Sequence, residues 1–298
     1  MSSSTQGLFP DLDLGNTFGA LFIGAILAAV LFGITNVQAF IYFQTHRGTA
    51  MTSYKFLVIW LWMLDALHLA LITHCVYYYL VTNYANISVL TEIVWSFKLH
   101  IVMCVIIVYG VHIMYACRIW ILTKHRSRAL PVIVGIIVIL TSGVAIALIW
   151  AIYQCHVFSD LIETAWATYI PLGTFAFDDF IIASSLCYIL ATSCTGFSNM
   201  DSFLIWLMVY IINTGLLTNV TSMVAIITFA VMPSNLIFIG VEFLIAGLYI
   251  NSYLALLNAG YYLQPNDSDT VNISEFRAHQ PSMQSTELEA ENPARNPR

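Results

Sequence analysis

Long uninterrupted runs of apolar residues dominate the chain, and polar residues collect in short stretches between them. An apolar run of about 20 residues is long enough to cross the hydrocarbon core of a bilayer as a helix. Inside the bilayer a helix satisfies its own backbone hydrogen bonds, which an open loop cannot do. The pattern therefore predicts seven membrane-spanning helices, near residues 17–43, 56–80, 94–120, 130–157, 166–192, 203–232 and 236–257.

The composition excludes a water-soluble domain. Hydrophobic residues make up 59% of the chain and charged residues only 9%, whereas soluble domains carry about 25% charged residues. The net charge of −6 comes mainly from the two tails, so it does not indicate nucleic-acid binding. We expect an all-α integral membrane protein, a bundle of seven transmembrane helices, with the lipid bilayer as its main partner.

The two ends of the chain differ in composition from the middle. Residues 1–16 form a short polar segment without a basic n-region, so we expect the first span to remain as an anchor. Residues 17–260 form the membrane domain. Residues 261–298 are rich in Asn, Asp, Ser, Glu and Pro, and they have too few apolar groups to offset the entropy cost of ordering. This composition predicts a disordered tail.

Basic residues fall almost entirely on one side of the membrane when the seven spans are threaded in order. Of the ten Lys and Arg residues, only Lys98 falls on the other side. By the positive-inside rule, the N-terminus lies outside and the C-terminus lies in the cytoplasm. The basic cluster around the third loop is a candidate contact for a cytoplasmic protein partner or anionic lipid. This cluster consists of Arg118, Lys124, Arg126 and Arg128.

Two further features lie on the predicted outer side. The run Asn86-Ile87-Ser88 fits the acceptor pattern for glycosylation of Asn86. Cys75 and Cys155 lie near the outer ends of their spans, where an oxidising compartment would allow them to pair. The interpretation favoured for these cysteines is that they are small buried apolar residues with free thiols.

Ionisable residues inside the predicted spans identify a candidate site, because burying one in a bilayer costs a few kcal/mol. Asp65 and His68 lie three residues apart on one face of the second span, within hydrogen-bonding reach. Asp178 and Asp179 are neighbours in the fifth span. Their directions differ by about 100°, so at most one should point squarely inward. By depth, we expect Asp65, Asp179 and Asn213 to form one buried polar cluster.

The candidate ligand- or ion-binding residues are Asp65, His68, Asp179, Asn213, Glu242 and Asn251. Lys98 lies just inside the third span, where it can reach the headgroups or pair with Glu242. The alternative role for such polar groups is to hold helices together, at about 0.6–2 kcal/mol each. That role is the one favoured for the asparagines.

Several chemistries lack the residues they need. A retinal protein requires a lysine deep in a late span, and the only lysines are Lys55, Lys98 and Lys124. His68, His74, His100 and His112 lie in the second and third spans and the seventh span has no histidine, which gives metal-dependent catalysis little support. The sequence contains no phosphate-binding glycine loop and no nucleophile elbow. We therefore expect neither an enzyme nor a bound cofactor or metal.

Several short motifs follow one another along the chain in a characteristic order. They include Leu31–Gln38 (LFGITNVQ), Leu64-Asp65 with His68, Arg118-Ile119-Trp120, Asn213–Thr218 (NTGLLT) and Tyr249–Ser252 (YINS). In this order they resemble a large family of fungal, basidiomycete-type seven-helix membrane proteins whose second half is classed as a domain of unknown function. The resemblance covers residues 17–260, and the second half corresponds to about 166–260. It implies the seven-helix fold and carries no settled activity.

The leading functional hypothesis is a receptor-like protein that senses a small-molecule ligand through the polar cluster. The first alternative is a transporter or channel for a proton or small solute, with Asp65, His68 and Asp179 as a relay. The second alternative is a structural membrane protein without a ligand. No retrieval signal ends the chain, and we expect the plasma membrane rather than an internal one.

Overall fold

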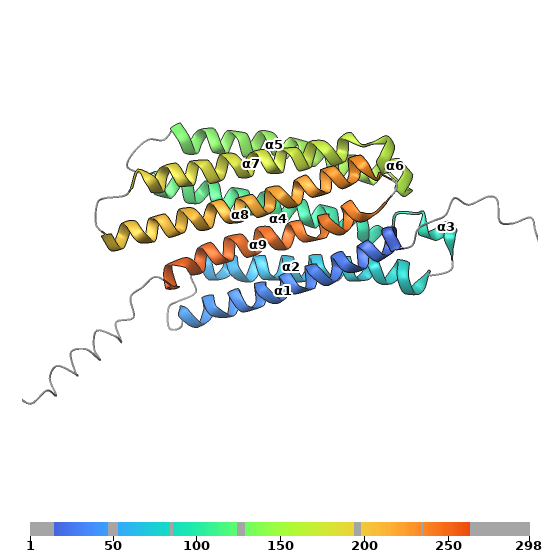
Figure 1. The fold of residues 1–298 in the computed structure, drawn as a ribbon, viewed down its shortest axis with the longest axis horizontal. Coiled ribbons are helices and arrows are strands. Elements are labelled where there is room, and N and C mark those ends of the chain that lie inside the picture. Colours follow the sequence, from blue (N-terminus) through green and yellow to red (C-terminus); the bar gives the residue numbers. More distant parts are fainter. Residues whose placement is uncertain are drawn as a thin grey trace, which may run out of the picture. The chain divides into compact units, whose positions relative to one another are not determined.

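The computed structural model describes residues 15–46, 53–83, 86–123, 129–193, 198–233 and 235–262. Within these ranges the chain is helical apart from short connections and an isolated bridge between Glu92 and Val157. Seven long helices lie alongside one another (Figure 1). They are α1 (Ala20–Thr45), α2 (Ser53–Tyr77), α4 (Trp95–Leu122), α5 (Ala129–Gln154), α7 (Trp166–Ala191), α8 (Ser198–Val231) and α9 (Ile237–Tyr262).

Shorter helical elements complete the bundle. The π-helical turn Gly15–Gly19 precedes α1, and the π-helical turn Tyr78–Thr82 extends α2. The short helices α3 (Ile87–Leu90) and α6 (Phe158–Glu163) lie at one end of the bundle, which we call the α3/α6 end (Figure 1). At the far end, α1, α4 and α7 end and α2, α5 and α8 begin (Figure 1).

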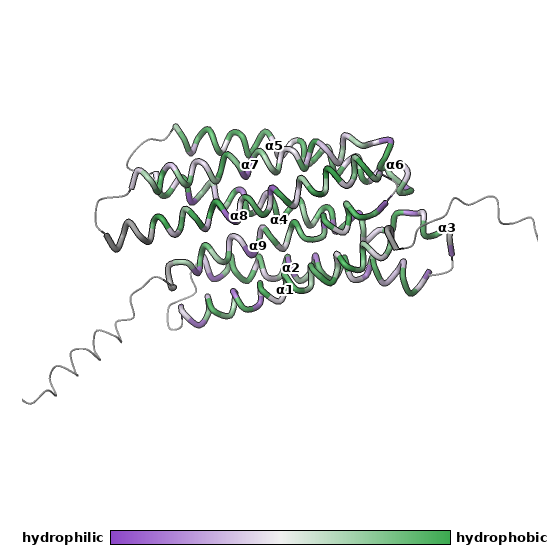
Figure 2. Tube along the Cα trace, in the orientation of Figure 1, coloured by the Kyte–Doolittle hydropathy of each residue, from purple (hydrophilic) through white to green (hydrophobic). Residues whose placement is uncertain are grey.

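Each long helix is apolar and long enough to cross a membrane, over Thr17–Thr45, Ser53–Thr82, Trp95–Leu122, Ala129–Gln154, Trp166–Ala191, Leu204–Val231 and Ile237–Ala259. The ends of these spans differ from the predicted ones by at most three residues. Hydrophobic residues run along all seven helices (Figure 2). For the described residues, the prediction of an all-helical bundle with seven helices long and apolar enough to cross a membrane is therefore confirmed.

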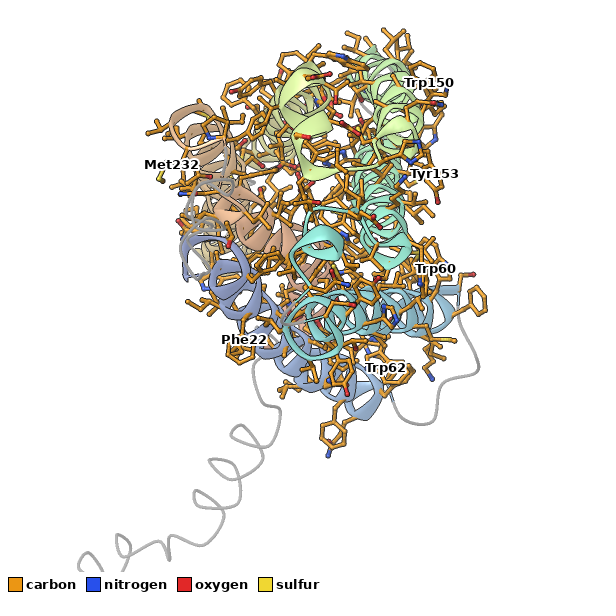
Figure 3. All side chains as sticks on the ribbon, turned by 90° about the vertical axis from the view of Figure 1, so that its right-hand side faces the viewer. Phe22, Trp60, Trp62, Trp150, Tyr153 and Met232 are labelled. Atoms are coloured by element: carbon orange, nitrogen blue, oxygen red, sulfur yellow. The ribbon has the colours of Figure 1, made fainter. Side chains whose placement is uncertain are left out.

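The helices divide into central and peripheral ones. In the most apolar stretch of each helix, 67% of the residues of α9 and 61% of those of α4 are buried, against 17% for α5. The peripheral helices present large apolar side chains outward, such as Phe22 and Trp150 (Figure 3). Ile139 on α5 is 71% exposed. Lipid chains are the solvent that suits such a surface, so the outer faces contact the bilayer.

The backbones of α1 and α9 touch at two glycines. A Cβ atom placed on Gly24 would lie 2.5 Å from the carbonyl oxygen of Gly240, and a Cβ on Gly240 would lie 2.6 Å from that of Ala20. No real side-chain atom tolerates such a distance, so only glycine fits at both positions. Small residues let membrane helices approach closely where lipid provides no hydrophobic drive for association.

Two asparagines extend this contact between α1 and α9. Asn251 Nδ2 donates to the carbonyl oxygen of Leu31 at 3.1 Å, and Asn258 Nδ2 donates to that of Gln38 at 2.9 Å. Both asparagines are buried. These bonds are interhelical contacts of the kind that the sequence favoured for the asparagines.

The loops at the α3/α6 end are tied together by backbone hydrogen bonds. Ile93 N–H donates to His156 O at 2.8 Å, and Phe158 N–H donates to Thr91 O at 3.0 Å. The hydroxyl of Tyr79 donates to Glu92 O at 2.7 Å. This end is therefore an ordered cap over the bundle rather than a set of independent loops.

Candidate functional site: a buried polar network

Asp179 is the centre of a polar network inside the bundle. Its Oδ1 atom lies 3.1 Å from Nε2 of His112 on α4. Its Oδ2 atom accepts hydrogen bonds from the hydroxyls of Thr218 on α8, at 2.6 Å, and Tyr249 on α9, at 2.7 Å. One carboxylate on α7 thus connects to three other helices. Such a node can both hold the helices together and respond to a change in its charge.

The neighbouring Asp178 joins the same network from the other side. Its Oδ2 atom lies 3.6 Å from Nδ1 of His112 and accepts a hydrogen bond from Thr141 on α5 at 2.7 Å. Tyr109 on α4 in turn donates to the carbonyl oxygen of Thr141 at 2.7 Å. The imidazole of His112 therefore lies between two carboxylates, one facing each ring nitrogen.

Both aspartates are buried, with exposed fractions of 1% for Asp178 and 8% for Asp179. The expectation that at most one of them points inward is therefore wrong. The reason is that α7 packs against α5, α4 and α8, so directions that differ by about 100° both lead into protein.

The network has hydrogen-bonding capacity that the protein does not use. His112 Nδ1 and Asp178 Oδ1 are buried and have no hydrogen-bond partner within the described part of the chain. A neutral imidazole donates from one nitrogen, and an imidazolium donates from both. Two carboxylates and a single imidazole thus form a group in which the position of one proton decides how many hydrogen bonds exist.

A small cavity borders the Asp179 side of the network. Its volume is about 30 Å³, and a single buried water molecule needs about 10–15 Å³ on this measure. Pockets for organic ligands are usually about 300–1,000 Å³. The space therefore suits water or a very small solute. Its polar lining residues are Tyr115, Asp179, Thr214, Thr218, Tyr249 and Ser252.

Asp65 and His68 have other partners than expected. The carboxylate of Asp65 accepts a hydrogen bond from Thr35 on α1 at 2.7 Å, and no hydrogen bond joins it to His68 among the described residues. The ring of His68 instead lies 5.8 Å from that of His100, centroid to centroid. Asp65 thus joins α1 to α2 and takes no part in the contacts of Asp179.

The prediction of one cluster containing Asp65, Asp179 and Asn213 is wrong. Asn213 lies on the exposed face of α8, whereas Ile211 and Thr218 lie on its buried face. Residues 211 and 213 differ by about 200° around a helix. Asn213 therefore points away from the network.

Of the two alternatives left open for Lys98, the pair with Glu242 is not formed. Lys98 Nζ donates to the carbonyl oxygen of Tyr153 at 3.4 Å and lies 5.8 Å from the centre of its ring. The side chain of Lys98 thus extends toward Tyr153, which is an exposed aromatic residue. Glu242 lies in a second cavity, which is described below.

The remaining predicted features have mixed outcomes. Cys75 and Cys155 are buried free thiols, which confirms the interpretation favoured from the sequence. Asn86 is exposed at the start of α3, and its glycosylation stays a prediction. Arg118 is half-buried and interacts electrostatically with Tyr253. The other members of the basic cluster, Lys124, Arg126 and Arg128, lie outside the described residues.

The sequence did not reveal the partners of Asp179. His112, Thr218 and Tyr249 come from helices far apart in the chain, and no local spacing relates them to Asp179. A partial signal existed, because a histidine in the middle of a span should face the protein interior. Hydroxyl groups carry no such signal, since Thr and Tyr are common throughout the spans.

Comparison with known proteins locates the network relative to a protein family. Residues 175–260 match the model of DUF6534, a family of unknown function. No curated protein and no solved structure matches the chain. The matched range contains Asp178, Asp179, Thr218 and Tyr249, and it excludes His112 and Thr141. The second half of this membrane protein thus contains a DUF6534 domain, in agreement with the predicted domain of unknown function. The polar network joins that domain to α4 and α5.

Proposed function

We propose that this protein is a receptor-like membrane protein whose helix arrangement is set by the polar network around Asp179. The observation that carries the proposal is that one buried carboxylate receives polar contacts from three other helices. A ligand or proton that altered the charge of this carboxylate would change all three contacts at once. The helices α4, α8 and α9 would then repack together, which is how a local change becomes a signal.

The size of the neighbouring cavity limits the ligand. A space of about 30 Å³ accommodates water or a solute of a few heavy atoms. In this proposal the ligand is such a small polar molecule, bound beside Asp179, Thr218 and Tyr249. A larger signalling molecule would need the helices to separate before it could enter.

The proposal includes an orientation for the signal. The N-terminus and the α3/α6 end face outside, and the C-terminal tail and the far end face the cytoplasm, in keeping with the distribution of basic residues. The basic residues from Arg118 to Arg128 would then contact a cytoplasmic protein or anionic lipid at the plasma membrane. A glycosylation reporter fused to the C-terminus tests this orientation, and its modification would overturn it.

A thermal-stability screen in lipid nanodiscs tests the proposed ligand site. The wild type and Asp179→Asn are compared against small polar solutes, and Asn213→Ala serves as a control that changes a polar residue outside the network. A ligand at 100 times its dissociation constant adds about 2.7 kcal/mol to the free energy of unfolding. We expect a saturable shift in the wild type and the control that Asp179→Asn abolishes. An equal shift in all three proteins would contradict the site.

A second candidate function is proton transfer, and the position of His112 favours it. An imidazole with a carboxylate at each nitrogen can accept a proton on one side and release it on the other. Proteoliposomes with an internal pH indicator measure such transfer directly. Flux in the wild type that both His112→Gln and Asp179→Asn abolish would favour transport over sensing. An absence of flux in the wild type would remove this candidate.

A further inference from the structure

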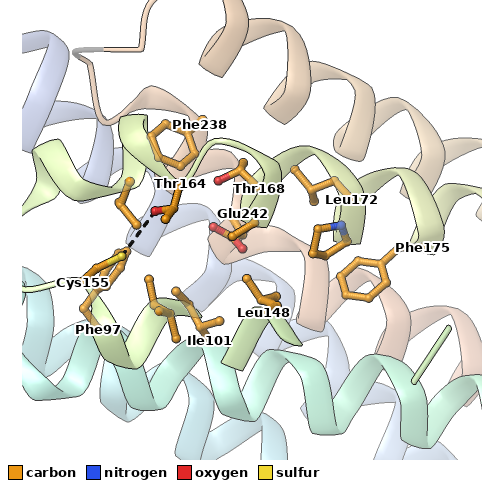
Figure 4. A pocket seen from close by; sticks show the side chains of 14 residues that line it. Phe97, Ile101, Leu148, Cys155, Thr164, Thr168, Leu172, Phe175, Phe238 and Glu242 are labelled. Atoms are coloured by element: carbon orange, nitrogen blue, oxygen red, sulfur yellow. Dashed lines mark hydrogen bonds between the residues drawn. The ribbon is translucent and has the colours of Figure 1, made fainter. Parts of the chain in front are cut away.

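A second cavity lies near the α3/α6 end, and it shares no lining residue with the cavity beside Asp179. Residues from α4, α5, α6, α7 and α9 surround it, and most of them are apolar. Glu242 on α9 is the only ionisable acid in its wall, and its carboxylate points into the space (Figure 4). The site is thus a carboxylate in a largely apolar chamber.

The carboxylate of Glu242 has no hydrogen-bond or ion-pair partner among the described residues. Lys98, which the sequence offered as one possible partner, donates a hydrogen bond to the carbonyl oxygen of Tyr153 instead. An unpaired charge in a membrane protein interior costs several kcal/mol unless a counter-charge compensates it or a proton neutralises it. The described part of the chain places such a group next to an open space and supplies no cation to it.

Other polar groups in the wall suit a positively charged N–H donor. The hydroxyl of Thr168 lines the cavity and has no hydrogen-bond partner within the described ranges. Pro171, inside α7, has no N–H group, so the carbonyl of Ala167 lacks its usual helical donor. Ala167 also lines the cavity. The wall therefore offers one carboxylate and at least one hydroxyl as acceptors, beside a backbone carbonyl that has lost its helical donor.

The aromatic residues of the wall suit a cation with an organic body. Phe97, Phe175 and Phe238 all line the cavity (Figure 4). The faces of aromatic rings attract ammonium groups, and the attraction grows when water is absent.

We propose that the Glu242 cavity binds a small primary ammonium compound, with its charged nitrogen at the carboxylate of Glu242 and its alkyl part among the phenylalanines. The cavity measures about 30 Å³, which is room for about two or three water-sized groups. Ethylammonium, with three heavy atoms, is a probe of that size. This site is separate from the Asp179 network, so it adds to the proposed function and does not depend on it.

Thermal unfolding of the full-length protein in nanodiscs tests the proposal, with ethylammonium chloride as the probe. Sodium, potassium and choline chloride at equal ionic strength serve as comparison salts. We expect a saturable rise in Tm with ethylammonium that the comparison salts do not reproduce. An equal rise with sodium or potassium would overturn the ammonium site, and so would no rise with ethylammonium.

Variants locate the effect. Glu242→Gln should abolish the ethylammonium shift, whereas Glu163→Gln makes the same chemical change on the exposed face of α6 and should keep it. An unchanged shift in Glu242→Gln would overturn the proposal. If that variant does not fold, Thr168→Leu keeps the carboxylate and fills the cavity. Thr168→Leu should raise the ethylammonium concentration that gives half of the maximal Tm shift at least tenfold. An unchanged concentration would also overturn the proposal.

Discussion

His112 and Asp179 lie 3.1 Å apart in the core of the bundle, although they are 67 residues apart in the chain. The pair connects α4, one of the two most buried helices, to the start of the DUF6534 domain. Thr218 and Tyr249 bring α8 and α9 to the same carboxylate. The two most buried helices, α4 and α9, are thus tied to α7 and α8 at one polar centre.

Removing the carboxylate of Asp179 should destabilise the bundle. Asp179→Ala leaves His112, Thr218 and Tyr249 without their shared acceptor, and each unsatisfied buried group costs about 1–3 kcal/mol. We expect a loss of about 2–5 kcal/mol, because the remaining groups can find partial new partners. Thermal unfolding in nanodiscs measures this loss. Asn213→Ala, on an exposed face of α8, should change the stability by less than about 0.5 kcal/mol.

The close contact between α1 and α9 predicts opposite effects for two glycines of the same helix. Gly24→Ala places a methyl group 2.5 Å from the carbonyl oxygen of Gly240, and backbone cannot move aside easily. Overpacking of this kind costs about 1–3 kcal/mol. Gly33→Ala meets nothing within 4 Å, and alanine favours the helix. A lower Tm for Gly24→Ala together with an unchanged or higher Tm for Gly33→Ala is expected; equal effects would mean that the helices do not touch there.

The hydrogen bond from Thr35 to Asp65 should couple α1 to α2. A double-mutant cycle with Thr35→Val and Asp65→Asn isolates this contact from the separate effects of each change. We expect a coupling energy of about 0.6–2 kcal/mol, as found for polar contacts between membrane helices. Thr73→Val provides a control, because the Thr73 hydroxyl bonds only within α2, to Leu69 O. Coupling between Thr73 and Asp65 of the same size would contradict the direct bond.

Acid should loosen the loop before α6. The backbone N–H of His156, at 2.7 Å, and that of Val157, at 3.1 Å, donate to Asp160 Oδ2 and hold the pKa of this carboxyl below its ordinary value of 3.8. Because the folded pKa is the lower one, the stabilisation is present above the ordinary value. It is lost as the pH falls through the folded pKa.

Hydrogen exchange at the amides of His156 and Val157 measures this effect. Protection, corrected for the intrinsic pH dependence of exchange, should fall on acidification in the wild type. Asp160→Ala should show low protection at neutral pH already, whereas Glu163→Ala on the same short helix should behave like the wild type. Protection of both amides that does not depend on Asp160 would refute the capping role.

The seven spans could be predicted from the sequence because their signal is local. An apolar stretch long enough to cross the bilayer reads as a helix whatever its neighbours are. The contacts that form the site are not local. Which residue of α4 meets Asp179 depends on the rotation and crossing of helices far apart in the chain, and mid-span depth alone placed Asp65 and Asn213 in the wrong cluster.

Two further features needed the structure for a similar reason. Gly24 and Gly240 are ordinary residues in apolar runs, and only the packing of α1 on α9 shows that neither can carry a side chain. Glu242 was recognised as a candidate from its charge, but Lys98, one alternative partner, lies beside Tyr153. The charge of a residue within a span marks it as a candidate site residue. Which partner it contacts depends on how the helices pack.

If the Asp179 network sets the arrangement of the helices, a change at Asp179 should move α4 and α8 relative to each other. Pulsed electron paramagnetic resonance tests it most directly, with spin-labelled noncanonical amino acids at Ile121 on α4 and Ile205 on α8, two exposed positions near the far end. The distance distribution in nanodiscs is compared between the wild type, Asp179→Asn and the control Asn213→Ala. We expect a shifted distribution in folded Asp179→Asn and the wild-type distribution in the control. A folded Asp179→Asn with the wild-type distribution, altered only in its Tm, would contradict it.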